Sequence, residues 1–426
     1  MIYYSPSKAS LHATKTSTGQ TGGLRAAVVS SVDNRPIENA TVTISYTGEP
    51  DSIIERVNTD SSGQTELLSL DAPPLEYSLE PGINQPYSEY TLTVSAEGFE
   101  PFDVSGTEIL PDTNSIQPIR LNPITPQGQG TNIVIPAHTL YGNYPPKIAE
   151  AEIKPLDESG EIVLSRVVVP EFVIVHDGAP TDSTAANHYV RYRDYVKNVA
   201  SCEIYATWPE ATITANVLAI MSFTLNRVFT EWYRNQGYSF TITSSTAFDH
   251  KWINGRNIFD SISQIVDEIF DQYLSRPDVR QPILTQYCDG RKSTCPNWMT
   301  QWGSKSLGDQ GYSPIEILRH FYGSDIYINS AEQISGVPSS WPGYNLTVGS
   351  SGDKVRQLQE QLDVIAEVYS AIPRIAADGI FGSATQEAVR EFQSIFDLPV
   401  TGIVDFATWY RISDIYVGIS RIAELT

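Results

Sequence analysis

Apolar and polar residues alternate along the first part of the chain, over residues 24–123. The runs at 41–44 and 90–94 follow a period of two, and Asn-Arg-Pro, Ser-Ser-Gly and Glu-Gly turns separate such runs at regular spacing. This pattern predicts an all-β sandwich built from short antiparallel strands. The preceding residues, 1–23, lack the apolar stretch of a secretory signal and are expected to form a flexible leader.

The apolar spacing changes to three and four residues in the central part of the chain, over residues 167–335. The stretch 211–237 predicts a long helix that Gly237 closes, and the stretch 257–276 predicts a second helix that ends before Pro277. Strand-like pieces lie between these helices, so the fold class expected here is α+β. The apolar stripes of the two helices are interpreted as core: Val217, Ile220, Met221, Leu225, Val228, Ile258, Ile262, Ile265, Val266 and Ile269.

The last segment, residues 345–426, has the pattern of a small α-helical bundle. Leu358, Leu362 and Ile365 define one amphipathic helix, and a second is centred on Val389. The sequences AADGIFGSAT and PVTGIVDFAT are alike, which indicates a duplicated unit. Residues 124–166, which open with a Pro/Gly/Gln-rich stretch, are expected to be a linker and pro-region.

Charge narrows the range of partners. The chain has 28 basic and 50 acidic residues and a formal net charge of -22. A field of this sign repels phosphate backbones, so no nucleic-acid partner is expected. No run of about 18 apolar residues occurs, so no membrane insertion is expected.

The three cysteines leave several interpretations open. Cys288 and Cys295 lie in CDGRKSTC, close enough to form a short disulfide loop or to remain as two free thiols. Together with His250 they form a less favoured candidate metal site, because the chain has no C-x-x-C pair. Cys202 is left over, next to Glu203.

The last segment resembles the peptidoglycan-binding type 1 family. The matching residues run from "L..G..G..V..LQ..L" through the DGIFG turn to Thr408-Trp409. The resemblance implies binding to the glycan or stem peptide of the bacterial wall. It assigns this binding to the DGIFG turn, namely Asp378, Gly379, Phe381 and Gly382, with the glycines serving turn geometry.

The central segment resembles SpoIID-like domains, whose members include lytic transglycosylases and amidase enhancers. The signature is YVKNVASCEIYATWPEATITANVLAIMSFTLNRV, in which Glu203 takes the position of the family's acid. The stretches STAFDHKWINGR and TQWGSKSLGDQGYS match further family motifs, although Asp249 stands where glutamine is usual. The resemblance implies a catalytic Glu203 and these substrate-binding residues: Ser245, Thr246, Asp249, Gln301 and Trp302. For Trp302 the alternative is packing as a buried side chain, which is the commoner role of tryptophan.

The order of the three segments resembles the spore cortex-lytic enzyme SleC family. The first segment resembles a carboxypeptidase regulatory-like domain of transthyretin type, which carries no chemistry of its own. The family resemblance implies a zymogen in the spore cortex and coat region or the cell wall, acting on cortex glycan. It also implies a germination protease that cuts near 164–170, and neither a cofactor nor a metal.

The reaction implied needs a single acid. A lytic transglycosylase protonates the departing glycosidic oxygen, and the resulting carboxylate then takes a proton from the sugar's own 6-hydroxyl. Two alternatives remain open: an N-acetylmuramoyl-L-alanine amidase, and a non-catalytic wall-binding or amidase-enhancing protein. The scattered His250 and His320 do not form the H-x-x-x-H pair of a zinc enzyme.

Overall fold

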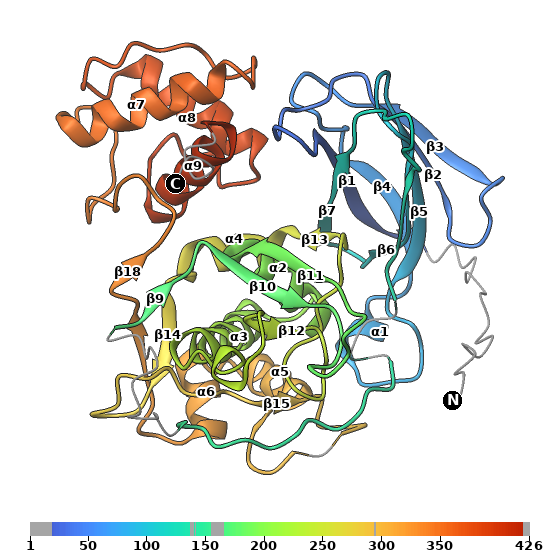
Figure 1. Ribbon diagram of the computed structural model, residues 1–426, viewed down its shortest axis with the longest axis vertical. Coiled ribbons are helices and arrows are strands. Elements are labelled where there is room, and N and C mark those ends of the chain that lie inside the picture. The colour runs from blue at the N-terminus through green and yellow to red at the C-terminus, as the bar shows by residue number, and fades with distance from the viewer. Residues whose placement is uncertain (1–18, 137–139, 141, 155–165, 294, 421–426) are drawn as a thin grey trace. The chain divides into compact units, whose positions relative to one another are not determined.

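The computed structural model describes residues 19–136, 140, 142–154, 166–293 and 295–420 (Figure 1). The chain divides into two compact units. The first comprises residues 1–32, 36–137 and 254–257, and the second comprises residues 33–35, 138–253 and 258–426. The leader expected at 1–23 lies mostly outside the described residues, and Gln20 to Gly23 belong to a strand.

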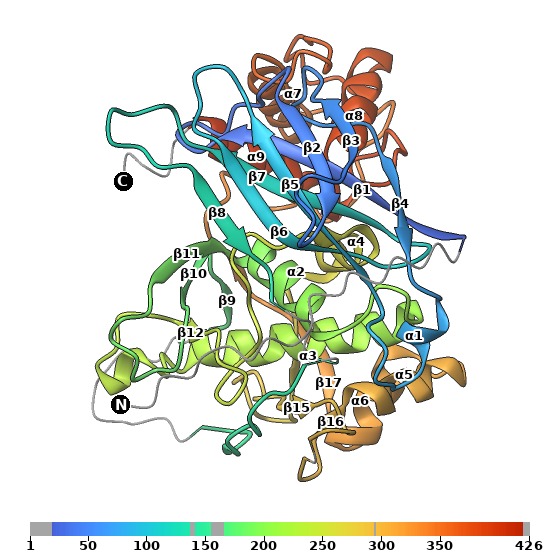
Figure 2. The same cartoon turned by 90° about the vertical axis from the view of Figure 1, so that its right-hand side faces the viewer.

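The first unit contains the β-sandwich expected from the alternating pattern (Figure 2). In one sheet β1 pairs antiparallel with β4 and parallel with β7. The other sheet has the order β3-β2-β5-β6-β8. Alternate residues Leu24, Ala26 and Val28 of β1 are buried, as a period of two requires. The elements are β1 (Gln20–Ser30), β2 (Thr41–Tyr46), β3 (Ile53–Asn58), β4 (Leu68–Ala72), α1 (Glu76–Leu79), β5 (Ser88–Ser95), β6 (Phe102–Ile109), β7 (Asn114–Leu121) and β8 (Thr131–Val134).

The sandwich is longer than the range 24–123 expected from the sequence. Strand β8 falls in the stretch expected to be linker, where it pairs parallel with β6 from Phe102↔Thr131 to Ser105↔Val134. This pairing satisfies main-chain groups of β6 that would otherwise form an open sheet edge. The Pro/Gly/Gln-rich stretch before β8 is therefore a connection inside the sandwich.

Helix α3 (Glu210–Phe229) forms the core of the central domain in the second unit. It packs against α2 (Tyr192–Glu203), α5 (Gln301–Asp309), α6 (Pro314–Tyr322) and β14 (Gln272–Ser275) (Figure 1). Its length and composition are sufficient to cross a membrane, but 89% of its apolar window is buried inside the protein. Burial of this kind is what the core helix of a globular domain shows.

Small sheets surround this helix. Strand β10 (Phe172–His176) pairs with β11 (Asn187–Arg191) and β12 (Ile242–Thr243), and β9 (Val168–Val169) pairs with β18 (Gln333–Ile334). Strand β14 pairs with β17 (Tyr327–Ser330), and β15 (Tyr287–Cys288) pairs with β16 (Met299–Thr300). Helix α4 (Asp260–Ile269) follows β13 (Ile258–Phe259). The mixed α and β content expected for 167–335 is confirmed.

Two helix ends differ from the sequence-based expectation. Helix α3 ends at Phe229, and the turn η1 (Arg234–Gln236) separates it from Gly237, which has a φ of 85°. Helix α4 ends at Ile269, and the residues expected to complete it form β14, which pairs with β17. At the end of α4, the pairing of β14 with β17 outweighs the local helical period.

The last segment folds as the expected helical bundle of α7 (Asp353–Ala366), α8 (Ser383–Ile395) and α9 (Phe406–Ser420). The duplication is visible in two glutamine side chains. The amide oxygen of Gln359 accepts the N–H of Gly379 at 2.8 Å, and that of Gln393 accepts the N–H of Gly402 at 2.8 Å. Each amide NH₂ donates to the carbonyl of the residue after that glycine, at 3.0 and 2.9 Å. The two turns are thus held by the same contact.

Candidate functional site

Glu203 is the last residue of α2, and its side chain is only 3% exposed. The helix ends there because Ile204 takes an extended conformation, with φ of -140° and ψ of 162°. Eleven of the twelve residues of α2 are buried, so the helix is fixed on nearly all sides. A carboxyl group at the end of such a helix has a well-defined position.

Three hydrogen bonds hold Glu203. The main-chain N–H of Lys251 donates to Oε1 at 2.8 Å, and the Gln301 side-chain amide donates to Oε2 at 3.0 Å. The same amide donates to the main-chain carbonyl of Glu203 at 2.7 Å. Gln301 is the first residue of α5, so that helix and the loop carrying Lys251 together orient the carboxyl group.

A pocket of about 50 Å³ lies at this carboxyl group. Of the residues predicted from the sequence, Glu203, Thr246 and Gln301 share it. This volume holds a few water molecules and is much smaller than a sugar ring. The remaining lining residues are Gly142, Tyr144, Pro145, Lys147, Tyr287, Cys288, Asp289, Lys292 and Ser293.

Lys147 and Tyr287 give the pocket its electrostatic character. Burial lowers the pKa of Lys147, although the charge of Glu203 acts in the opposite direction. Burial, and then the charge of Glu203, raises the pKa of Tyr287 well above its usual value. The Lys147 ammonium lies 4.7 Å from the centre of the Tyr287 ring, which is a cation–π distance.

Ser245, Asp249 and Trp302 were predicted as substrate-binding residues, and the structure does not place them in this pocket. Asp249 is 0% exposed, and its carboxylate accepts hydrogen bonds from Arg227 at 2.8 Å and from the Tyr233 hydroxyl at 2.6 Å. Its role in this structure is to neutralise a buried arginine. Ser245 lies one residue before Thr246 in the same turn.

Trp302 packs in an aromatic cluster. Its ring centre lies 5.0 Å from that of Trp208 and 6.2 Å from that of Tyr205, and the side chain is 8% exposed. Both partners follow Glu203 closely in the sequence. The aromatic cluster therefore packs next to the end of α2 and stabilises it.

Of the alternatives for Cys288 and Cys295, the structure contains the disulfide. Cys288 and Cys295 are bonded, and the buried thiol of Cys202, which is in no disulfide, donates to the side-chain oxygen of Asn198 at 3.6 Å. Inside the loop that the disulfide closes, the carboxylate of Asp289 accepts the N–H groups of Lys292 and Ser293, both at 2.7 Å. The alternative metal site is not formed, because the bond consumes both thiols. Among the described residues, no cluster of three or more His, Cys, Asp or Glu side chains could hold a metal ion.

The residues predicted to bind peptidoglycan lie in and beside the turn before α8. Gly379 has a φ of 77°, a conformation that favours glycine, and Asp378 accepts a hydrogen bond from Gln359 at 2.9 Å. Phe381 is fully buried, so it supports the turn from inside. The neighbouring Ile380 is 59% exposed and presents an apolar surface next to Gly382.

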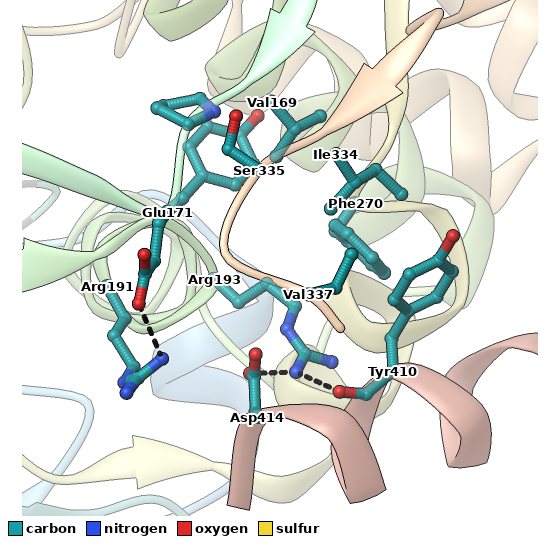
Figure 3. Close-up of a pocket in the computed structure, with 12 residues that line it drawn as sticks. Val169, Glu171, Arg191, Arg193, Phe270, Ile334, Ser335, Val337, Tyr410 and Asp414 are labelled. Carbon is teal, nitrogen blue, oxygen red and sulfur yellow. Dashed lines mark hydrogen bonds and ion pairs between the residues drawn. The ribbon is translucent and has the colours of Figure 1, made fainter. Parts of the chain in front are cut away.

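A second pocket lies where α9 meets the central domain (Figure 3). Arg193 of α2 donates to the carbonyl of Tyr410 at 3.0 Å and also pairs with the carboxylate of Asp414. Glu171 and Arg191 pair on the other side, 3.6 Å apart. These charged groups pair with one another, so we interpret this pocket as part of the packing between α9 and the central domain. It contains none of the predicted site residues.

Sequence reasoning did not identify Lys147, Tyr287 and Asp289 as residues of the site. Lys147 lies in the stretch expected to be pro-region, 56 residues before Glu203. Asp289 stands in the short CDGRKSTC loop, where the pair of cysteines offered a signal for a fixed, ordered rim.

Comparison with known proteins identifies one part of the chain. The family model described as "Putative peptidoglycan binding domain" matches residues 351–412. A zinc D-Ala-D-Ala carboxypeptidase from Streptomyces albus G is 42% identical over 73 residues, which are 17% of this chain and 27% of that protein. The chain thus spans about a quarter of the length of that relative.

Similarity to solved structures is local. The SleB N-terminal domain is 30% identical, covering 18% of this chain and 99% of that one, with a TM-score of 0.16. Catechol 1,2-dioxygenase from Acinetobacter sp. ADP1 is 14% identical, covering 28% of this chain and 60% of that one, with a TM-score of 0.18. Scores this low carry no functional argument. Residues 351–412 of this chain belong to the peptidoglycan-binding domain family.

Proposed function

We propose that this protein is a peptidoglycan lytic transglycosylase in which Glu203 acts as general acid and then as general base. The observation that carries the proposal is the placement of Glu203, a buried carboxyl group held by Lys251 and Gln301 at the floor of a pocket. The peptidoglycan-binding domain supplies the attachment to substrate.

Glu203 is one of two carboxylates that line this pocket, and each of the two accepts two N–H hydrogen bonds. The other lining carboxylate, Asp289, is engaged by two N–H groups of its own loop. Glycosidases that use water as nucleophile need a pair of carboxyl groups, whereas an intramolecular attack needs one. Glu203 is assigned as the acid because it stands at the acid position of the motif that resembles SpoIID-like domains, and the proposed reaction uses no second carboxylate.

The reaction proceeds in two proton transfers. Glu203 donates its proton to the glycosidic oxygen as the bond from that oxygen to C1 of the muramic acid residue breaks. The 6-hydroxyl of the same sugar then attacks C1, and the Glu203 carboxylate takes the hydroxyl proton. The products are a 1,6-anhydro-muramic end and a free 4-hydroxyl on the departing sugar, and Glu203 regains its starting state.

Product analysis tests this proposal. Purified spore cortex is digested with the protein and with Glu203→Gln, and the new ends are identified by mass spectrometry. We expect anhydro-muramic ends from the parent and a loss of at least about a thousandfold in rate for Glu203→Gln. Glu210→Gln, which changes an exposed acid seven residues away, is the matched control. Free stem peptides, or full activity of Glu203→Gln, would overturn the proposal.

We also propose that the chain is a zymogen of the spore cortex, activated by a protease that cuts near 164–170. The resemblance described above supports this step, and the first two residues of the range lie outside the described residues. Cleavage of the purified protein by spore extract, followed by sequencing of the new amino terminus, tests it. A cut within 164–170 that raises cortex lysis is the expected result.

A further inference from the structure

Residues 142–154 were expected to be pro-region, yet their even-numbered residues from Ile148 onward are bound to the central domain. The N–H of Ile148 donates to the carbonyl of Ala247 at 2.7 Å, and its carbonyl accepts from Gln286 at 2.7 Å. The N–H of Lys154 donates to the side chain of Gln281 at 2.7 Å. The segment is therefore attached through the main chain of alternate residues, although it forms no strand and the Ile148 side chain is 48% exposed.

Two bidentate ion pairs strengthen this attachment. Arg227 of α3, whose side chain is 0% exposed, donates to both oxygens of Glu150 at 2.6 and 2.9 Å. Arg276 donates to both oxygens of Glu152 at 2.8 and 2.9 Å. Because Arg227 is buried, removing Glu150 would leave Asp249 as the carboxylate that pairs with this arginine.

The segment also balances the charge of the site. With Glu203 ionised, the cluster holds three carboxylates and three cations: Glu203, Asp249, Glu150, Lys147, Arg227 and Lys154. Without the segment, this cluster would keep two carboxylates, Glu203 and Asp249, and one cation, Arg227, which pairs with Asp249. His250 does not supply the missing cation, because burial and the neighbouring Lys147 and Arg227 hold its pKa well below the usual value.

We propose that residues 142–154 are a permanent wall of the catalytic unit, which stays bound after activation, and that Lys147 is a positioning residue for Glu203. This inference rests on the proposed function of Glu203. The Lys147 amino group donates to the carbonyl of Asp249 and lies over the Tyr287 ring. It stabilises the carboxylate that forms when Glu203 gives its proton to the glycosidic oxygen, which is a stabilisation present in the transition state.

The rim of the pocket is held separately from this wall. The amino group of Lys292, on the disulfide loop, donates to the carbonyl of Gly142 at 3.0 Å and closes the rim. Gly142 lies six residues before Ile148, the first anchored position, so the rim can move without displacing the anchored part.

Retention of the wall is tested by cutting the full chain on both sides of it. Protease sites are introduced within 137–141 and 155–165, the protein is cleaved, and the complex is weighed by native mass spectrometry. We expect the peptide carrying residues 142–154 to remain bound in physiological salt, and Glu150→Gln with Glu152→Gln to release it. Loss of the peptide from the parent with full cortex lysis retained would overturn the proposal.

The role of Lys147 is tested by Lys147→Met and Lys147→Arg in the cleaved protein. We expect Lys147→Met to lower kcat by about tenfold or more with KM unchanged, and Lys147→Arg to restore part of the loss. Arg234→Met, which removes an exposed cation of the central domain, is the control for activity, and Lys354→Met in the binding domain serves only as a control for wall binding. Because Lys147→Met removes a positive charge from the pocket, the alkaline limb of the activity profile should move upward. Glu150, Asp249, Arg227 and Tyr287 remain in place in each variant.

The outcomes separate this inference from the proposed function. If Glu203→Gln is inactive while Lys147→Met has the rate and pH profile of the parent, the positioning role fails and the proposed function stands. If Glu203→Gln is active, the proposed function itself fails. A loss of rate in Lys147→Met without a change in the pH profile, and without rescue by arginine, would assign Lys147 a purely structural role.

Discussion

The side-chain amide of Gln301 donates to both the carboxylate and the main-chain carbonyl of Glu203, at 3.0 and 2.7 Å. One side chain therefore fixes the end of α2 and the direction of its last carboxyl group. We expect Gln301→Leu to lower kcat on cortex by about 10- to 100-fold, the equivalent of one hydrogen bond to a charged group. Ser306→Ala on the same helix is the control, and an unchanged kcat for Gln301→Leu would show that Glu203 is oriented by other means.

Acid stability should depend on Asp267. Burial raises the pKa of this carboxyl, but the nearby Lys197 and Arg193 outweigh it and hold the pKa below its usual value. The stabilisation is therefore present above about pH 4 and is lost as the pH falls through the lower folded-state value. We expect Asp267→Asn to cost about 3–5 kcal/mol at pH 7 and less at pH 3. Urea unfolding at both pH values measures this, and an equal cost at both would contradict it.

The Cys288–Cys295 bond should control the rim of the pocket. Both Asp289 and Lys292 lie inside the loop that it closes. We expect Cys288→Ser with Cys295→Ser to reduce stability by about 2 kcal/mol and to lower cortex lysis. Dithiothreitol should reproduce the loss in the parent and have no effect on the double variant. Lysis by the parent that is insensitive to full reduction would show that the rim is ordered without the bond.

The binding domain should depend on its two turn-holding glutamines. Gln393→Leu leaves the N–H groups of Thr401 and Gly402 without their acceptor, at a cost of about 1–3 kcal/mol. We expect this variant to lose affinity for isolated cell walls in a sedimentation assay. Glu387→Gln, an exposed change on the same helix, should bind as the parent does. Full wall binding by Gln393→Leu together with Gln359→Leu would separate turn geometry from recognition.

The sequence predicted those parts of the fold whose apolar residues recur at a short, regular spacing. The period of two located the sandwich, and the spacing of Leu358, Leu362 and Ile365 located a helix whose three side chains are all 0% exposed. The predicted end of α4 was wrong because β14 forms by pairing with β17, some 55 residues later in the chain. Local pattern carries no information about such a partner.

The candidate site was predictable only in part, for a similar reason. Glu203, Thr246 and Gln301 lie on matched motifs, and the structure brings them to one pocket. Asp249 lies on such a motif too, but its partner Arg227 is on a helix face that sequence alone interprets as core. Lys147 had no motif, because its importance comes from charge balance across three separate segments.

The paired contacts of Gln359 and Gln393 have an evolutionary consequence. Each half of the carboxy-terminal bundle satisfies the polar groups of its own turn, by means of one amide on its own helix. Exposed positions such as Ile380 and Val400 are therefore free to mutate without harming either half. Surface substitutions alone could therefore change which part of the cell wall this domain binds during evolution, while its helices and turns stay the same.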